Sequence, residues 1–282
     1  MYCIGVSRLL RQRNRSQSDR SQSRGNTSPS GNRRKDSLVT LVPFWPMGAA
    51  IAGYGVLGFA LIGPPDAFAS DVFFAHMIQH LLLIMAAAPL LLVSGPIASY
   101  LWAMPLIARK RVGATIKQSG RLRRLIRQAT APRLALTLFV FTIWLWHIPT
   151  LYDLALENEV IHLMEHGTMF LVSLLFWWPI IGPAPVRSRL TYPQRIIYLL
   201  LAVTPNAALG ALITLSPPLY PYYASTPSHW GLTTGEDQRI GGLLMWIPGN
   251  LIFLLTLSVL FFKWFELEER NSMPPVNPGS GH

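Results

Sequence analysis

The sequence divides into long apolar runs separated by charged connections, and this segregation restricts what the chain can fold into. Only 13% of its residues are charged and 51% are hydrophobic, whereas soluble domains carry about 25% charged residues. A run of about 20 apolar residues can cross the hydrocarbon core of a bilayer as a helix. Because that core holds no water to hydrogen-bond an irregular backbone, we predict an all-α fold, a polytopic membrane helix bundle.

Six transmembrane helices are predicted from the length and hydropathy of the runs. They cover residues 44–62, 72–93, 133–148, 159–181, 194–215 and 241–264. The apolar stretch 97–108 is too short to span and is expected to lie at the interface or against the bundle. We expect residues 43–268 to form the bundle, between a disordered basic tail at 1–42, which has no apolar core to fold around, and a disordered C-terminal tail at 269–282.

The basic residues predict the orientation of the helices. All but one of the 24 Lys and Arg residues lie in the tails, in the connections 94–132 and 182–193, or at the span ends that border them. The opposite connections hold only Arg239, together with several acidic residues. Cytoplasmic connections are enriched in Lys and Arg, so both termini are expected to be cytoplasmic. The composition of 1–42 also matches an organellar transit peptide, but a cytoplasmic tail is the simpler interpretation.

The distribution of charge also bears on partners and on metal chemistry. The net charge of +11 follows from topology, so no nucleic acid is expected as a partner, and membrane lipid is the expected contact of the basic tail. A single cysteine, Cys3, excludes a disulfide framework and any multi-cysteine metal site. A metal site in this chain must therefore use histidine, methionine or carboxylate ligands.

Two matched histidine motifs lie near the outer ends of the second and fourth predicted spans. His76 and His80 are four residues apart, as are His162 and His166, so each pair shares one face of a helix. His147 ends the third span on the same side of the membrane. Consecutive helices are neighbours by default, so these five histidines are expected to converge. Ionisable groups inside a membrane are costly to bury, and such a cluster therefore indicates a functional site.

The residues around the histidines are typical of a metal site. Neutral imidazole binds copper, zinc, iron and nickel, and the thioether of Met169, one turn beyond His166, favours Cu(I). Gln79 and Glu165 are expected to orient imidazoles by hydrogen bonds, and Glu165 could also bind a metal directly. Asp237 could either hydrogen-bond toward the histidines or cap a helix. A purely structural network of hydrogen-bonded histidines is the alternative to a metal site.

Four polar segments recur in order along the membrane region. They are residues 75–83, residues 146–153, residues 162–166 followed by 175–179, and residues 237–249. Together they resemble the CtaG family of cytochrome c oxidase assembly factors, multispan proteins associated with caa-type oxidases, over about residues 44–270. The resemblance implies a protein of the bacterial cytoplasmic (inner) membrane that is needed to mature haem–copper oxidase. It also implies delivery of copper to the CuB centre of that oxidase.

Two hypotheses from different classes follow. The first is an assembly factor that catalyses no reaction and uses the five histidines and Met169, on the periplasmic side, to pass Cu(I) to subunit I of a haem–copper oxidase. The second is a haem b electron-transfer protein, because histidines on facing helices also ligate haem. The histidines crowd one side, which disfavours electron transfer across the membrane. A transporter is disfavoured because the inner halves of the second and fourth spans are almost purely apolar.

Overall fold

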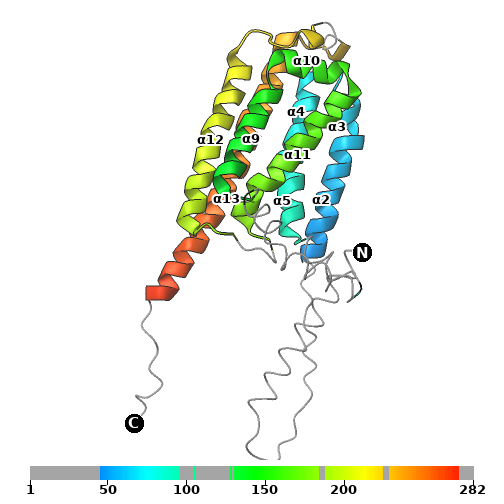
Figure 1. Cartoon of the computed structure of the whole chain (residues 1–282). Helices are drawn as coiled ribbons and strands as arrows, with labels where there is room; N and C mark the ends of the chain where they lie inside the picture. The colour runs from blue at the N-terminus through cyan, green and yellow to red at the C-terminus, as the bar shows by residue number, and fades with distance from the viewer. Residues whose placement is uncertain are drawn as a thin grey trace, which may run out of the picture.

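The structure is a computed structural model that describes residues 45–95, 105, 128, 130–183, 188–224 and 229–272. The described residues form helices and contain no strand (Figure 1). Five helices among them are long and apolar enough to cross a membrane, and a bent pair of helices provides a sixth crossing if it is counted as one span. The all-α polytopic bundle predicted from the sequence is confirmed.

The first two crossings are joined by one short helix. The first is α2, Trp45–Ile62, and the connecting helix is α3, Pro64–Ala67. The second is a rod in three parts: α4, Phe73–Leu81; η1, Leu82–Ala87; and α5, Ala88–Val93. The middle part, η1, is a π-helix, a form that is rare and often occurs at functional sites. Nothing in the sequence pattern indicated it.

The third crossing is sharply bent. It consists of α9, Pro132–Trp146, and α10, Pro149–Glu157, whose axes differ by 74°. Pro149 explains the break, because a proline has no backbone N–H to donate and disfavours a helical conformation at the residue before it; Ile148 is accordingly extended. The sequence placed 149–158 in a connection between spans. In the structure this segment is a helix that lies across one end of the bundle (Figure 1).

Three long helices complete the bundle. They are α11, Glu159–Ile181; α12, Tyr192–Leu215; and α13, Thr234–Ser272. The last is longer at both ends than the predicted span 241–264. The start of α2 and the end of α13 lie at the same end of the bundle, opposite α10 (Figure 1), as an even number of crossings requires.

Some sequence predictions fall on segments that the structure does not describe. The tail at 1–42 and nearly all of the stretch 97–108 lie outside the described residues. The same is true of residues 273–282 in the predicted C-terminal tail, whereas 269–272 continue α13.

An aromatic layer beneath α10 fixes the start of α4. The ring of Phe73 stacks on that of Tyr220, with centroids 4.8 Å apart, and contacts the rings of Tyr152 and Tyr223 at 5.5 and 5.9 Å. Gly241 of α13 faces the same ring, and a Cβ atom at this position would lie 2.4 Å from it. The absence of a side chain at Gly241 therefore allows α13 to approach α4 closely.

Replacing Gly241 with alanine is expected to destabilise the protein. The new Cβ must displace the Phe73 ring, which three tyrosines hold, and such overpacking costs about 1–3 kcal/mol. Thermal unfolding of the detergent-purified protein, followed by circular dichroism, should show a lower Tm. Gly55→Ala is the matched control, because a Cβ atom there meets nothing within 4 Å. An equal Tm for the two variants would contradict the close approach.

Candidate metal centre

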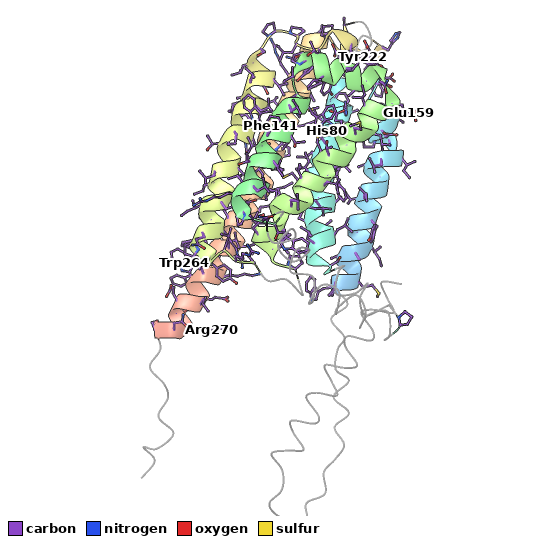
Figure 2. The ribbon with its side chains drawn as sticks, viewed as in Figure 1. His80, Phe141, Glu159, Tyr222, Trp264 and Arg270 are labelled. Atoms are coloured by element: carbon purple, nitrogen blue, oxygen red, sulfur yellow. The ribbon has the colours of Figure 1, made fainter. Side chains whose placement is uncertain are left out.

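Four ligand-type side chains converge at the end of the bundle that α10 covers. His76 and His80 come from α4, and Glu165 and His166 come from α11. One ligand atom from each lies within 4.8 Å of all the others, and all four residues are buried. Figure 2 shows His80 inside the bundle toward this end, with Trp264 and Arg270 at the opposite end. We refer to these four residues as the His₃Glu cluster.

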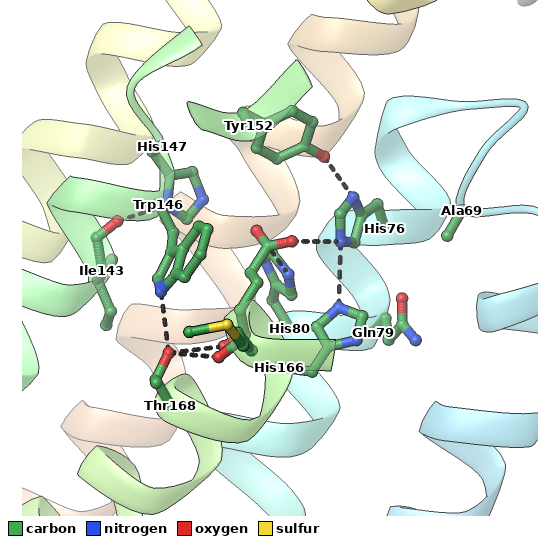
Figure 3. A network of polar contacts seen from close by, with 12 residues as sticks. Ala69, His76, Gln79, His80, Ile143, Trp146, His147, Tyr152, His166 and Thr168 are labelled. Carbon is green, nitrogen blue, oxygen red and sulfur yellow. Dashed lines mark hydrogen bonds and ion pairs between the residues drawn. The ribbon is translucent and has the colours of Figure 1, made fainter. Parts of the chain in front are cut away.

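The spacing within the His₃Glu cluster matches that of ligands around one ion. The Nε2 atoms of His76 and His166 are 3.1 Å apart. The Glu165 carboxylate oxygens lie 3.6 Å from His76 Nε2 and 3.5 Å from His80 Nε2. In a tetrahedral site with metal–nitrogen bonds of 2.0–2.1 Å, ligand atoms are about 3.3 Å apart. The cluster can therefore close around a metal ion with small movements of its side chains (Figure 3).

Several polar atoms of the cluster make no hydrogen bond within the protein. Both carboxylate oxygens of Glu165 and both ring nitrogens of His80 are buried and accept or donate no hydrogen bond. Buried polar atoms are nearly always paired, and an unpaired one costs about 1–3 kcal/mol. A cation at the centre of the cluster would pair the carboxylate and the imidazole lone pairs together. The donor set therefore fits a metal ion.

The hydroxyl of Tyr152 orients His76. It lies 2.8 Å from Nδ1 of His76, and the ring of Tyr152 contacts that of Tyr223, whose hydroxyl donates to the carbonyl of Ala69 at 2.5 Å. When His76 binds a metal through Nε2, its proton is on Nδ1 and the Tyr152 oxygen accepts from it. This arrangement leaves the Nε2 lone pair of His76 facing His166 and Glu165, which is the tautomer that a metal ligand requires.

His147 and His162 lie beside the cluster rather than within it. The ring of His147 is 5.8 Å from that of His80, and its Nδ1 atom is 2.7 Å from the carbonyl oxygen of Ile143. The ring of His162 is 4.2 Å from that of His166 and is partly exposed. The Nε2 atoms of both histidines are buried without a partner. All five predicted histidines are thus near one another, and three of them belong to the cluster.

The other predicted site residues have different surroundings. Met169 is fully buried in the hydrophobic core. The amide of Gln79 donates to a carboxylate oxygen of Asp66 at 2.8 Å. The carboxylate of Asp237 accepts from the backbone N–H groups of Phe73 and Phe74 at 2.7 and 2.9 Å, so it caps the start of α4. Of the two roles open to Asp237 in the sequence, the structure gives it the helix cap.

The sequence pattern alone indicates no site role for Tyr152, Tyr223 or Asp66. The hydropathy of 149–158 predicts a connection and so gives Tyr152 no place near the histidines, although proline is a common first residue of a helix and Pro149 is a signal for one. A helix at this position would have placed Tyr152 near His147. Tyr223 and Asp66 lie in short elements between spans, and no local pattern connects them with the histidines.

Comparison with known proteins identifies the family. Residues 31–266 match the family model of the cytochrome c oxidase caa3 assembly factors, called Caa3_CtaG. The chain belongs to this family. All four segments that carried the resemblance lie within the matched residues, so the resemblance drawn from the sequence is confirmed.

Relatives of this CtaG-family chain occur in mycobacteria. It is 31% identical over 234 residues to an uncharacterized protein of Mycobacterium bovis and to one of Mycobacterium tuberculosis, and 28% identical over 239 residues to one of Mycobacterium leprae. Each match covers 80% of this chain but only 35% of the relative. The chain thus spans about a third of the length of these relatives. No solved structure matches it.

Replacing Asp237 with alanine should destabilise this CtaG-family protein by about 1–2 kcal/mol, because two backbone N–H groups at the start of α4 lose their acceptor. The Tm of the purified protein measures the effect. Glu157→Ala removes an exposed carboxylate from the same end of the bundle and serves as the control. If both variants melt like the wild type, the cap is not a significant tie between α13 and α4.

Proposed function

We propose that this caa3-type oxidase assembly factor binds Cu(I) in the His₃Glu cluster and supplies it to the CuB centre of subunit I of a haem–copper oxidase. The observation that carries the proposal is the convergence of three imidazoles and one carboxylate, among which the Glu165 oxygens and both His80 ring nitrogens are buried and make no hydrogen bond in the protein. The family supplies the link to oxidase assembly. In this function the protein carries cargo and catalyses no reaction.

The charge of the cluster supports a monovalent ion. Three neutral imidazoles and one carboxylate carry a net charge of −1, which Cu(I) neutralises. A divalent ion would leave a net positive charge in a buried, low-dielectric site, and an uncompensated charge there is costly. Imidazole ligands suit copper, and the carboxylate provides the charge that retains a single cation.

The position of the cluster supports transfer to a membrane-embedded partner. It lies at one end of a bundle of membrane-spanning helices, and the distribution of basic residues predicts that this end faces the periplasm. At that end, Asp66 of the connecting helix α3 accepts from Gln79, and the partly exposed His162 lies one turn before His166, toward the start of α11. Copper enters past these side chains and leaves by ligand exchange, in which an acceptor ligand replaces one imidazole at a time.

The same geometry disfavours haem b. Axial histidines bind haem iron from opposite faces of the porphyrin, so the ring must fit between them. The His76 and His166 nitrogens are only 3.1 Å apart, and the Glu165 carboxylate lies beside them. The cavity next to His80 measures about 20 Å³, which is close to the room needed for one water molecule. A single ion fits this space and a porphyrin does not.

A double variant, His76→Ala with His166→Ala, should lose tightly bound copper. The wild type, loaded with Cu(I) in detergent and dialysed against a Cu(I) chelator, is expected to keep about one copper per chain, since its ligands are held in place before binding. Copper and iron are measured by mass spectrometry. His229→Ala is the control, because His229 is exposed and lies in a connection. A wild type that retains no copper, or a double variant that retains as much, would contradict the proposal.

Tyr152→Phe should weaken Cu(I) binding by roughly 10–100-fold, the usual effect of removing a group that orients a metal-binding histidine. The reason is that His76 Nδ1–H loses its acceptor and the imidazole no longer holds one tautomer. Competition with a Cu(I) chelator measures the affinity. Tyr198→Phe is the matched control, since this buried tyrosine donates to the carbonyl of Phe176, far along α11 from the cluster. It should lower the Tm similarly and leave the affinity unchanged.

A further inference from the structure

A small cavity adjoins the His₃Glu cluster on the way into the bundle. Its volume is about 20 Å³, and His80, a member of the cluster, forms part of its wall. The other polar or sulfur-containing lining residues come from four helical elements and the end of α9: Met77, Met85, His147, Asn206 and Met245. No carboxylate lines it. We refer to this space as the methionine cavity.

His147 is prepared for metal binding at the wall of the methionine cavity. Its Nδ1 atom is 2.7 Å from the Ile143 carbonyl, which can only accept, so Nδ1 carries the proton. The Nε2 lone pair is consequently free, and this atom is buried without a partner in a residue that is 6% exposed. Histidines that bind metals usually donate their other N–H to a carbonyl or carboxylate in this way.

The three methionines give the cavity a ligand character different from that of the cluster. Thioether sulfur is a soft ligand that selects Cu(I), whereas carboxylate is a hard one. Methionine often serves only to fill gaps in an apolar core, and such packing would by itself account for the presence of these three methionines. It does not explain the partnerless imidazole nitrogen beside them, nor a space large enough for one ion or water molecule.

The methionine cavity is also placed to receive an ion from the cluster. His80 belongs to both, and its ring is 5.8 Å from that of His147. Met85 lies beyond His80 along the rod, in η1. A second hollow of about 10 Å³ shares Asn206 and Ile143 with the cavity and lies between α9 and α12. The route from the cluster thus points toward the side of the bundle, where a membrane-embedded acceptor would dock.

We infer that the methionine cavity is a second, weaker binding site for Cu(I), formed by His147 Nε2 and thioether sulfur, which takes the ion from the His₃Glu cluster through His80. The direction of transfer rests on the proposed function. The second site is weaker because it lacks a carboxylate and because an ion in the cluster repels an ion in the cavity. It holds a soft monovalent cation and excludes Zn²⁺, whose usual ligands are nitrogen, oxygen and thiolate.

The test is an anaerobic titration of the full-length, detergent-purified chain with Cu(I), followed by X-ray absorption spectroscopy at each step. The wild type should bind a first equivalent with nitrogen and oxygen scattering only, then a second equivalent that adds copper–sulfur scattering. A triple variant, Met77→Leu, Met85→Leu and Met245→Leu, should keep the first equivalent and lose the second. Leucine preserves size and apolarity, so the fold should persist. Met164→Leu, at an exposed site on α11, is the control.

The outcomes separate this inference from the proposed function. Saturation of the wild type at one equivalent, without sulfur scattering, would overturn the methionine site and leave the cluster intact. A triple variant that keeps the sulfur signal would also overturn it. The double variant His76→Ala with His166→Ala should still bind one weak equivalent with sulfur scattering. If the wild type lacks the tight first equivalent, the proposed function fails, whatever happens in the cavity.

Discussion

The carboxylate of Asp237 joins the longest helix of the bundle to the helix that carries two of the clustered histidines. In a membrane interior, the first N–H groups of a helix find no water, so a side chain from elsewhere in the fold must accept from them. Asp237 is 164 residues away from Phe73 in the chain and supplies this acceptor. The close contact of Gly241 with Phe73 then follows one turn later. The depth and rotation of α4, and hence of His76 and His80, depend on this pair of contacts.

Around the His₃Glu cluster, most buried polar side chains are paired with backbone groups. Gln238 bonds to carbonyls at the end of α12, Trp177 donates to Ile84 in the π-helix, and Tyr223 donates to Ala69. The partnerless atoms are concentrated instead on Glu165, His80, His147 and their neighbours. A fold that pairs most of its buried polar groups and concentrates the open ones around one internal point has the form of a binding site, because the missing partner must come from outside the chain.

Much of the fold and part of the candidate site could be predicted from the sequence. Hydropathy and charge are local properties, so the span 159–181 matches α11 and the convergence of five histidines follows from neighbouring helices. The rotation of a helix about its axis is not local. For that reason the sequence does not show which thioethers face His147: Met169 lies one turn beyond His166, and Met77, Met85 and Met245 line the cavity that includes His147. The role of Tyr152 depends on the 74° bend between α9 and α10, and hydropathy carries no information about that angle.

The π-helix η1 follows His80 almost directly. A π-helical turn holds one more residue than the same turn of an α-helix would, so the side chains beyond it are rotated relative to those before it. The rod from Phe73 to Val93 therefore presents two faces that are set independently. The part of the rod before the π-helix turns two imidazoles toward α11. The part after it packs apolar residues against α2 and α11. The extra residue of the π-helix thus allows the histidines at one end of the rod and the apolar packing residues at the other end to be oriented independently, without a break in the rod.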